Sequence, residues 1–149
     1  MLALLDRMDD VADVIEEAIF QLGLLAQPVM PPLPQEVRRS LCDLAEATLA
    51  ALQDQIRAIE MARHLDEGVA QVEGEEFLQA LWRILRAERV CDECLRQART
   101  QIVLLLHDRP AAMQLATELA ATTESATDHL LGAAYALRKM VFEKTGVQA

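Results

Sequence analysis

Apolar residues recur along this chain at spacings of three and four, which is the period of an α-helix with one buried face. Proline and glycine interrupt this pattern at three places: the stretch AQPVMPPLP, the interval bracketed by Gly68 and Gly74, and Asp108–Pro110. The pattern therefore predicts four helices, over residues of about 2–25, 35–66, 75–106 and 110–145. The buried stripes expected for the first two are Leu4, Met8, Val11, Ile15, Ala18 and Leu22, and Leu41, Leu44, Leu52, Ile56 and Ile59.

Long segments joined by short connections favour an antiparallel bundle with nearly parallel helix axes. The composition agrees, because 52% of the 149 residues are hydrophobic while only 3% are aromatic and five are glycine. These values are typical of an all-α domain and argue against a β sandwich or barrel. We expect Asp108 to cap the fourth helix, with Pro110 in its first turn and Gly146 at its end. No such entry signal follows Met1, so the first helix resembles one whose first turns are missing.

The chain carries 24 Asp and Glu against 14 Lys and Arg, a formal net charge of −10. This balance argues against DNA or RNA as a partner and favours cations or basic protein surfaces. The first twenty residues lack the basic region of a signal peptide, and no apolar run approaches the length of a membrane span. We therefore expect a cytoplasmic protein without direct membrane insertion. Its three cysteines, Cys42, Cys91 and Cys94, should be reduced.

In two of the predicted helices, carboxylates occupy positions where an apolar row would continue. The row in 75–106 passes from Leu85 to two acids before Leu95, and the row in 110–145 contains two acids between Ala120 and Leu131. A third pair borders the apolar face of 2–25. Residues four apart share one helix face, so each pair presents two carboxylates together, which favours a nearby cation. The candidate metal ligands are Asp9 with Asp13, Glu88 with Asp92, and Glu124 with Asp128.

Two interpretations of these pairs remain open from the residues alone. Carboxylates with bound waters suit Ca²⁺ or Mg²⁺, and also iron, manganese or zinc. Alternatively, the protein is a metal-free helical interaction or scaffold module whose acidic rows pair with arginines. Arginine outnumbers lysine twelve to two, and Arg83, Arg86 and Arg89 lie near Glu88 in the sequence.

Other residues that could carry chemistry have simpler explanations. Cys91 and Cys94 form a CxxC in the middle of a predicted helix, which favours two small buried thiols over a redox or zinc motif. Glu60 and His64 are expected to form an exposed polar pair, and His129 to lie on the surface. There is no Glu-x-x-His, glycine-rich phosphate loop or GxSxG elbow. We therefore expect no enzymatic activity.

Three stretches, LLDRMDDVADVIEEA, RAERVCDECL and TESATDHLLGAAYALRKMVFEKTG, resemble the PhoU-like phosphate transport regulators, especially the short relatives that accompany Pit-type phosphate transporters. The resemblance implies long helices whose repeated E(D)xxxD motifs bind multinuclear iron or zinc clusters, with manganese or magnesium less expected. It also implies a regulatory role, exerted on a phosphate transporter or its signalling partner at the inner face of the membrane. The acids that match the motif are the six named above.

The family's opening helical hairpin has no counterpart in this chain. The further acid that commonly follows the motif in the last helix is also absent, because the chain reads Leu131, Gly132 and Ala133 there. Helix 2–25 and its neighbours should therefore expose apolar surface that the hairpin covers in a full-length relative. We expect a homodimer or a larger homo-oligomer that buries this surface.

Overall fold

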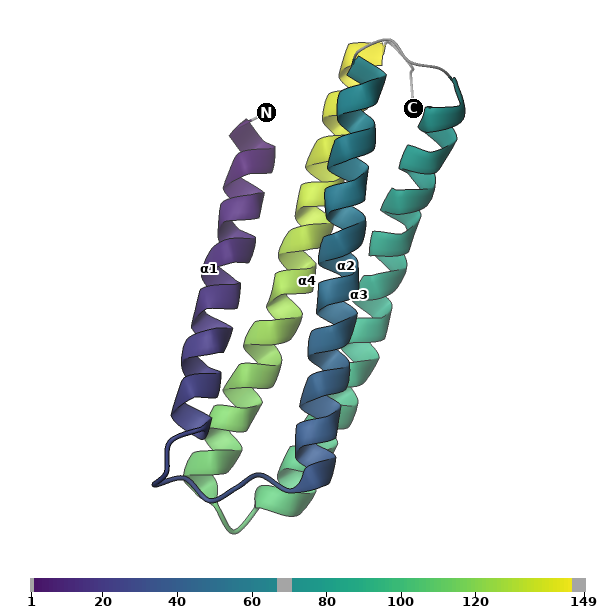
Figure 1. Cartoon of the computed structure of the whole chain (residues 1–149). Coiled ribbons are helices and arrows are strands. Elements are labelled where there is room, and N and C mark those ends of the chain that lie inside the picture. The colour runs from purple at the N-terminus through teal and green to yellow at the C-terminus, as the bar shows by residue number, and fades with distance from the viewer. Residues whose placement is uncertain (1, 67–70, 146–149) are drawn as a thin grey trace.

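The structure is a computed structural model that describes residues 2–66 and 71–145, and these form four helices (Figure 1). They are α1 (Leu2–Leu25), α2 (Gln35–Asp66), α3 (Gln71–Leu106) and α4 (Pro110–Thr145). Consecutive helices run in opposite directions, and none of the described residues forms a strand. The predicted all-α antiparallel bundle is confirmed.

One helix start and one helix cap differ from the prediction. Helix α3 begins at Gln71, so Gly74 lies inside it; Gly68 lies outside the described residues, as does Gly146 at the predicted end of α4. The cap of α4 is Arg109 and not Asp108, because the Met113 N–H donates to the Arg109 carbonyl oxygen at a nitrogen–oxygen distance of 2.9 Å.

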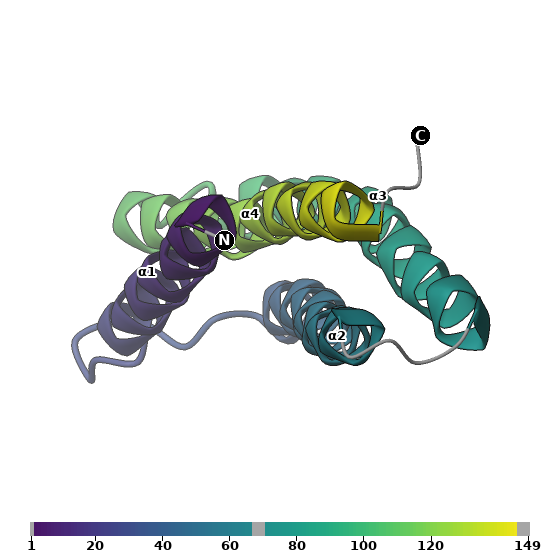
Figure 2. The same cartoon turned by 90° about the horizontal axis from the view of Figure 1, so that it is seen from above.

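Helix α4 packs against each of the other helices, and α2 also packs against α3. Viewed along the bundle, α1, α4 and α3 form an arc, and α2 lies inside this arc beside α3 and α4 (Figure 2). Within residues 2–66 and 71–145, α1 packs against α4 alone. The bundle is therefore open between α1 and α2.

Small side chains allow α4 to meet three helices. Alanines occupy most of its buried positions, while larger side chains such as Leu130 and Leu137 fill the spaces between the helices. Small residues at a contact let helix axes approach closely, which lets the larger ones interdigitate. The buried alanines of α4 are Ala112, Ala116, Ala120, Ala126, Ala133 and Ala134.

The open side of the bundle changes two predicted core positions. Leu22 of α1 and Ile56 of α2 were expected to be buried, but they are 54% and 47% exposed. Each lies on an apolar stripe, so the helical period was interpreted correctly at these positions. The prediction is wrong because α1 and α2 do not pack against one another in the described chain.

Replacing Leu44 with alanine should destabilise the fold by about 2–5 kcal/mol, because this fully buried side chain would leave a cavity between α2 and its neighbours. Urea unfolding measures the change. Leu49→Ala is the matched control on the same helix, since Leu49 is largely exposed and its loss should cost less than about 0.5 kcal/mol. Equal losses from the two substitutions would contradict this packing.

Candidate functional site

Four of the six predicted metal ligands lie on neighbouring helices. Glu88 and Asp92 come from α3, and Glu124 and Asp128 come from α4, which packs beside it. The pKa of Glu124 is raised, first by burial and then by the negative charges of Asp128, Asp92 and Glu88, while Arg99 acts in the opposite direction. The two pairs, distant in sequence, therefore form one electrostatic group, called here the acidic face.

The predicted row of α3 is out of phase with its buried side. Cys91 is fully buried, whereas Glu88 and Asp92 are only half-buried and Leu78 is exposed. Asp92 follows Cys91 directly and is turned by about 100° from it, so it lies beside the buried row. Glu88 lies four residues after Ile84 and three before Cys91, so it interrupts the buried row as predicted. The buried residues of α3 over 75–106 are Phe77, Ala80, Leu81, Ile84, Cys91, Leu95, Ala98, Ile102 and Leu106.

The row predicted through the acids of α4 is also displaced. Thr127 and Leu130 are fully buried, while Asp128 and Tyr135 are exposed. Glu124 is half-buried, which explains why desolvation contributes most to its raised pKa. The acidic face therefore lies at the edge of the α3–α4 contact and not in the core.

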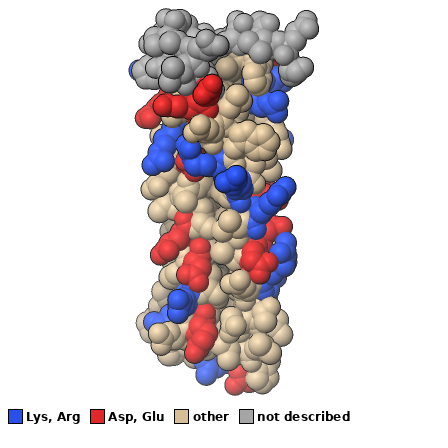
Figure 3. All heavy atoms as spheres, turned by 90° about the vertical axis from the view of Figure 1, so that its right-hand side faces the viewer, with Lys and Arg blue, Asp and Glu red and all other residues tan. Residues whose placement is uncertain are grey.

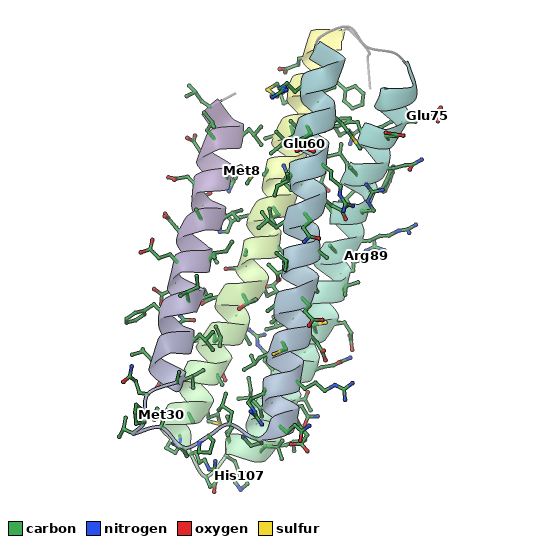
Figure 4. The ribbon with its side chains drawn as sticks, viewed as in Figure 1. Met8, Met30, Glu60, Glu75, Arg89 and His107 are labelled. Atoms are coloured by element: carbon green, nitrogen blue, oxygen red, sulfur yellow. The ribbon has the colours of Figure 1, made fainter. Side chains whose placement is uncertain are left out.

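Arginines neutralise only part of this face. Arg96 Nη2 lies 2.9 Å from Asp92 Oδ2, and Arg96 Nη1 lies 2.8 Å from Glu93 Oε2. The arginines predicted to neutralise Glu88 do not pair with it: Arg83 Nε lies 2.9 Å from Asp54 Oδ1 on α2, and Arg89 points away from the bundle (Figure 4). Acidic and basic side chains are interspersed over the side of the molecule on which α3 lies (Figure 3). Of the six candidate acids, Asp92 alone takes part in an ion pair within the described chain.

The third predicted pair lies apart from the other two. Asp9 and Asp13 are exposed on α1, which does not pack against α3 in the described chain. The acid of α1 that contacts α4 is Asp10, whose Oδ2 lies 3.5 Å from His129 Nδ1. His129, predicted to lie on the surface, is partly exposed, and its contact with α1 was not predicted.

No three His, Cys, Asp or Glu side chains among the described residues converge closely enough to hold one ion. What the acidic face offers is an excess of carboxylate oxygens on two adjacent helices. Such an arrangement attracts hard cations, which accept water and carboxylate oxygens together. The exposed Glu60 was predicted to pair with His64, whose side chain lies outside the described part of the chain.

The CxxC belongs to the packing between helices. Cys91 Sγ accepts a hydrogen bond from Thr127 Oγ1 at 3.3 Å, and Thr48 Oγ1 lies 3.3 Å from Thr127 Oγ1. These three buried residues connect α2, α3 and α4, a contact that the sequence analysis missed although Thr48 lies between Leu44 and Leu52 on a predicted stripe. The pKa of the Cys94 thiol is raised, first by burial and then by Cys91, Asp43 and Glu93. A redox-active thiol needs the opposite shift.

None of the helices within the described ranges is both long and apolar enough to cross a membrane. Comparison of the chain with protein-family models, with curated proteins and with solved structures gives no match. The functional interpretation therefore depends on the geometry of the chain and on its sequence motifs.

Replacing Glu124 with glutamine should raise stability at neutral pH. A raised pKa means that the folded state holds the Glu124 proton more tightly than the unfolded state, so stability falls as pH rises from the ordinary value of 4.5 through the raised one. Glu124→Gln removes this loss. Thermal unfolding from about pH 4 to about pH 7 should therefore show the stability of the variant rising relative to that of the wild type. Glu118→Gln, at an exposed position of the same helix, is the control; parallel pH profiles for Glu124→Gln and the wild type would contradict the assignment.

The three thiols should react with iodoacetamide in a fixed order at about pH 7.5. Cys42 is exposed and should react first, Cys94 should react slowly because its pKa is raised, and buried Cys91 should react last. Mass spectrometry of the alkylated peptides measures the order. Fastest reaction at Cys94 would instead indicate an activated thiol.

Proposed function

We propose that this chain is a PhoU-like regulatory protein that binds metal cations at the acidic face and acts by protein contact on a phosphate transporter or its signalling partner. One observation carries the metal part: the two E/DxxxD pairs lie on α3 and α4, which pack against each other, and Glu124 is half-buried there, with its pKa raised first by burial and then by the three other carboxylates. The transporter part is supported by the resemblance of the sequence to that family.

A bound cation would relieve the repulsion within the acidic face. Glu88, Asp92, Glu124 and Asp128 would hold it, and it would supply positive charge that links α3 to α4. Oxygen donors without nitrogen or sulfur suit iron better than zinc, and manganese or magnesium would accept the same donors. Since these side chains do not converge on a single point, the proposal requires side-chain movement or bridging water on binding.

The pair on α1 has a different place in this proposal. Asp9 and Asp13 are exposed, and α1 reaches the rest of the chain through α4. A cation at this pair would not be shared with the acidic face. We therefore propose the acidic face as the principal metal site.

A second candidate function is a metal-free interaction module in which arginines balance the acids. The ion pairs of Arg96 with Asp92 and of Arg83 with Asp54 favour it, because both use nitrogen–oxygen distances of 2.9 Å. The Arg83–Asp54 pair also joins α3 to α2. Both candidates predict a protein that acts by contact with other proteins, and they differ in metal content.

Replacing Glu88 and Asp92 together with alanine should remove most of the bound metal, because it deletes the α3 half of the acidic face. Elemental analysis of purified, untagged protein measures the stoichiometry. The control is Glu75→Ala with Glu76→Ala, which removes two exposed acids from the same helix and leaves this face intact.

Equal metal content in the wild type and in the Glu88/Asp92 variant would overturn the metal part and favour the module. The transporter part is tested separately, by measuring uptake of radiolabelled phosphate. The cells lack the native gene and carry either the wild-type protein or the Glu88/Asp92 variant. Unchanged uptake on deletion of the gene would overturn that part.

A further inference from the structure

An apolar groove of about 590 Å³ runs between α1 and α2. Helix α4 forms its floor through residues such as Leu119 and Leu130, and Leu33 of the connecting segment lies at one end. The walls are formed by Ile15, Ile19 and Leu22 of α1 and by Leu41, Leu49 and Leu52 of α2. The groove lies on the open side of the bundle seen in Figure 2.

The length of the groove suits one more helix. Packed helices lie about 8–10 Å apart, and both α1 and α2 pack against α4 without packing against each other in the described chain. On α2 the lining extends from Arg38 to Leu52, which is about 21 Å of helix, or about four turns. A helix placed there would contact α1, α2 and α4 at once.

The walls carry large apolar side chains without a partner. Ile19 is 65% exposed and Leu49 is 53% exposed, and both lie on the groove. An apolar surface of this kind, bordered by polar residues, marks an interaction site more often than free surface. A helix with a leucine-rich face would bury these side chains.

The charges beside the groove indicate the character of that helix. Helix α1 contains six carboxylates and one arginine. Glu16, three residues before Ile19 of the α1 wall, is exposed and has no ion-pair partner within the described chain. Arg38 is the only basic or acidic side chain of the lining, and it lies at the start of α2. It favours a bound helix whose carbonyl end lies at this end of the groove. A second copy of this chain, if it inserted its own α1, would bring its acids against these acids.

We propose that the groove binds an amphipathic helix of another protein, with a leucine-rich face and lysine or arginine on its flanks. This inference deepens the interaction part of the proposed function and rests on it only there. Binding of a helix in the groove needs no metal, because the groove and the acidic face lie on different sides of α4. Asp128 points away from the side of α4 that carries Leu119 and Leu130. The two proposals can therefore fail separately.

The test uses two synthetic helical peptides with the same leucine face, acetyl-LKKLLKLLKKLLKL-amide and its counterpart with glutamate in place of lysine. Binding is measured by fluorescence anisotropy at about 0.05 M and about 0.5 M salt. Cys42 lies on the groove, so slower alkylation of Cys42 reports occupancy of this site. Ile19→Gln with Leu49→Gln changes the walls, at positions already exposed in the free protein. The control is Val103→Gln with Leu104→Gln, two residues of α3 that are 58% and 62% exposed outside the groove.

The lysine peptide should bind, protect Cys42 and weaken at high salt. The Ile19/Leu49 variant should bind the lysine peptide at least about tenfold more weakly, while the Val103/Leu104 control should bind it as the wild type does. Glu16→Gln should reduce both the affinity and its salt dependence. The Glu88/Asp92 variant should bind the peptide as the wild type does, whatever its metal content.

Four results would overturn the proposal. Equal binding of the glutamate peptide would remove the charge argument, and unchanged binding by the Ile19/Leu49 variant would place the peptide elsewhere. A dimer in light scattering that this variant dissociates would make the occupant a second copy of the chain. An acyl-chain ligand seen by native mass spectrometry, and lost in this variant, would make the groove a lipid site.

Discussion

The packing of three helices around α4 is the constraint on which the rest of this structure depends. A helix can be contacted on three sides only if its side chains leave room for the neighbouring axes, and α4 meets this requirement with buried alanines such as Ala116 and Ala133. The same helix then separates two surfaces. Glu124 lies at its edge with α3, while Leu119 and Leu130 face the interval between α1 and α2.

Partial burial gives the acidic face its character. A fully exposed set of carboxylates would be screened by water and salt, and a fully buried set would be too costly to keep charged. Glu124 lies between these limits, so its neighbours on both helices influence its proton. Arg96 offsets one of the four acids, and the remaining negative charge is available to a cation or to a basic partner.

The number of helices and most of their ends could be predicted from the sequence, because proline and glycine mark the breaks and the helical period persists between them. The phase of α3 could not, since its buried row contains Cys91 and Ala98, whose small side chains are less conspicuous than the leucines at 78 and 85. Exposed apolar surface on α1 and its neighbours was predicted, but its place in a groove between α1 and α2 was not. A stripe shows which face of a helix is apolar but not whether a second stripe covers it. The Asp10–His129 contact likewise depends on how α1 packs on α4.

Within the described part of the chain, α1 is attached through a single neighbouring helix, and this has an energetic consequence. Segments held by one interface open with a smaller free energy than segments enclosed on several sides, so α1 forms the natural unit of sub-global unfolding in this bundle. A helix in the groove would give α1 a second interface, and its binding free energy would be linked to the docking of α1. Amide hydrogens of α1 would then exchange more slowly as the concentration of that helix increases, which couples local order at one end of the chain to the presence of a partner.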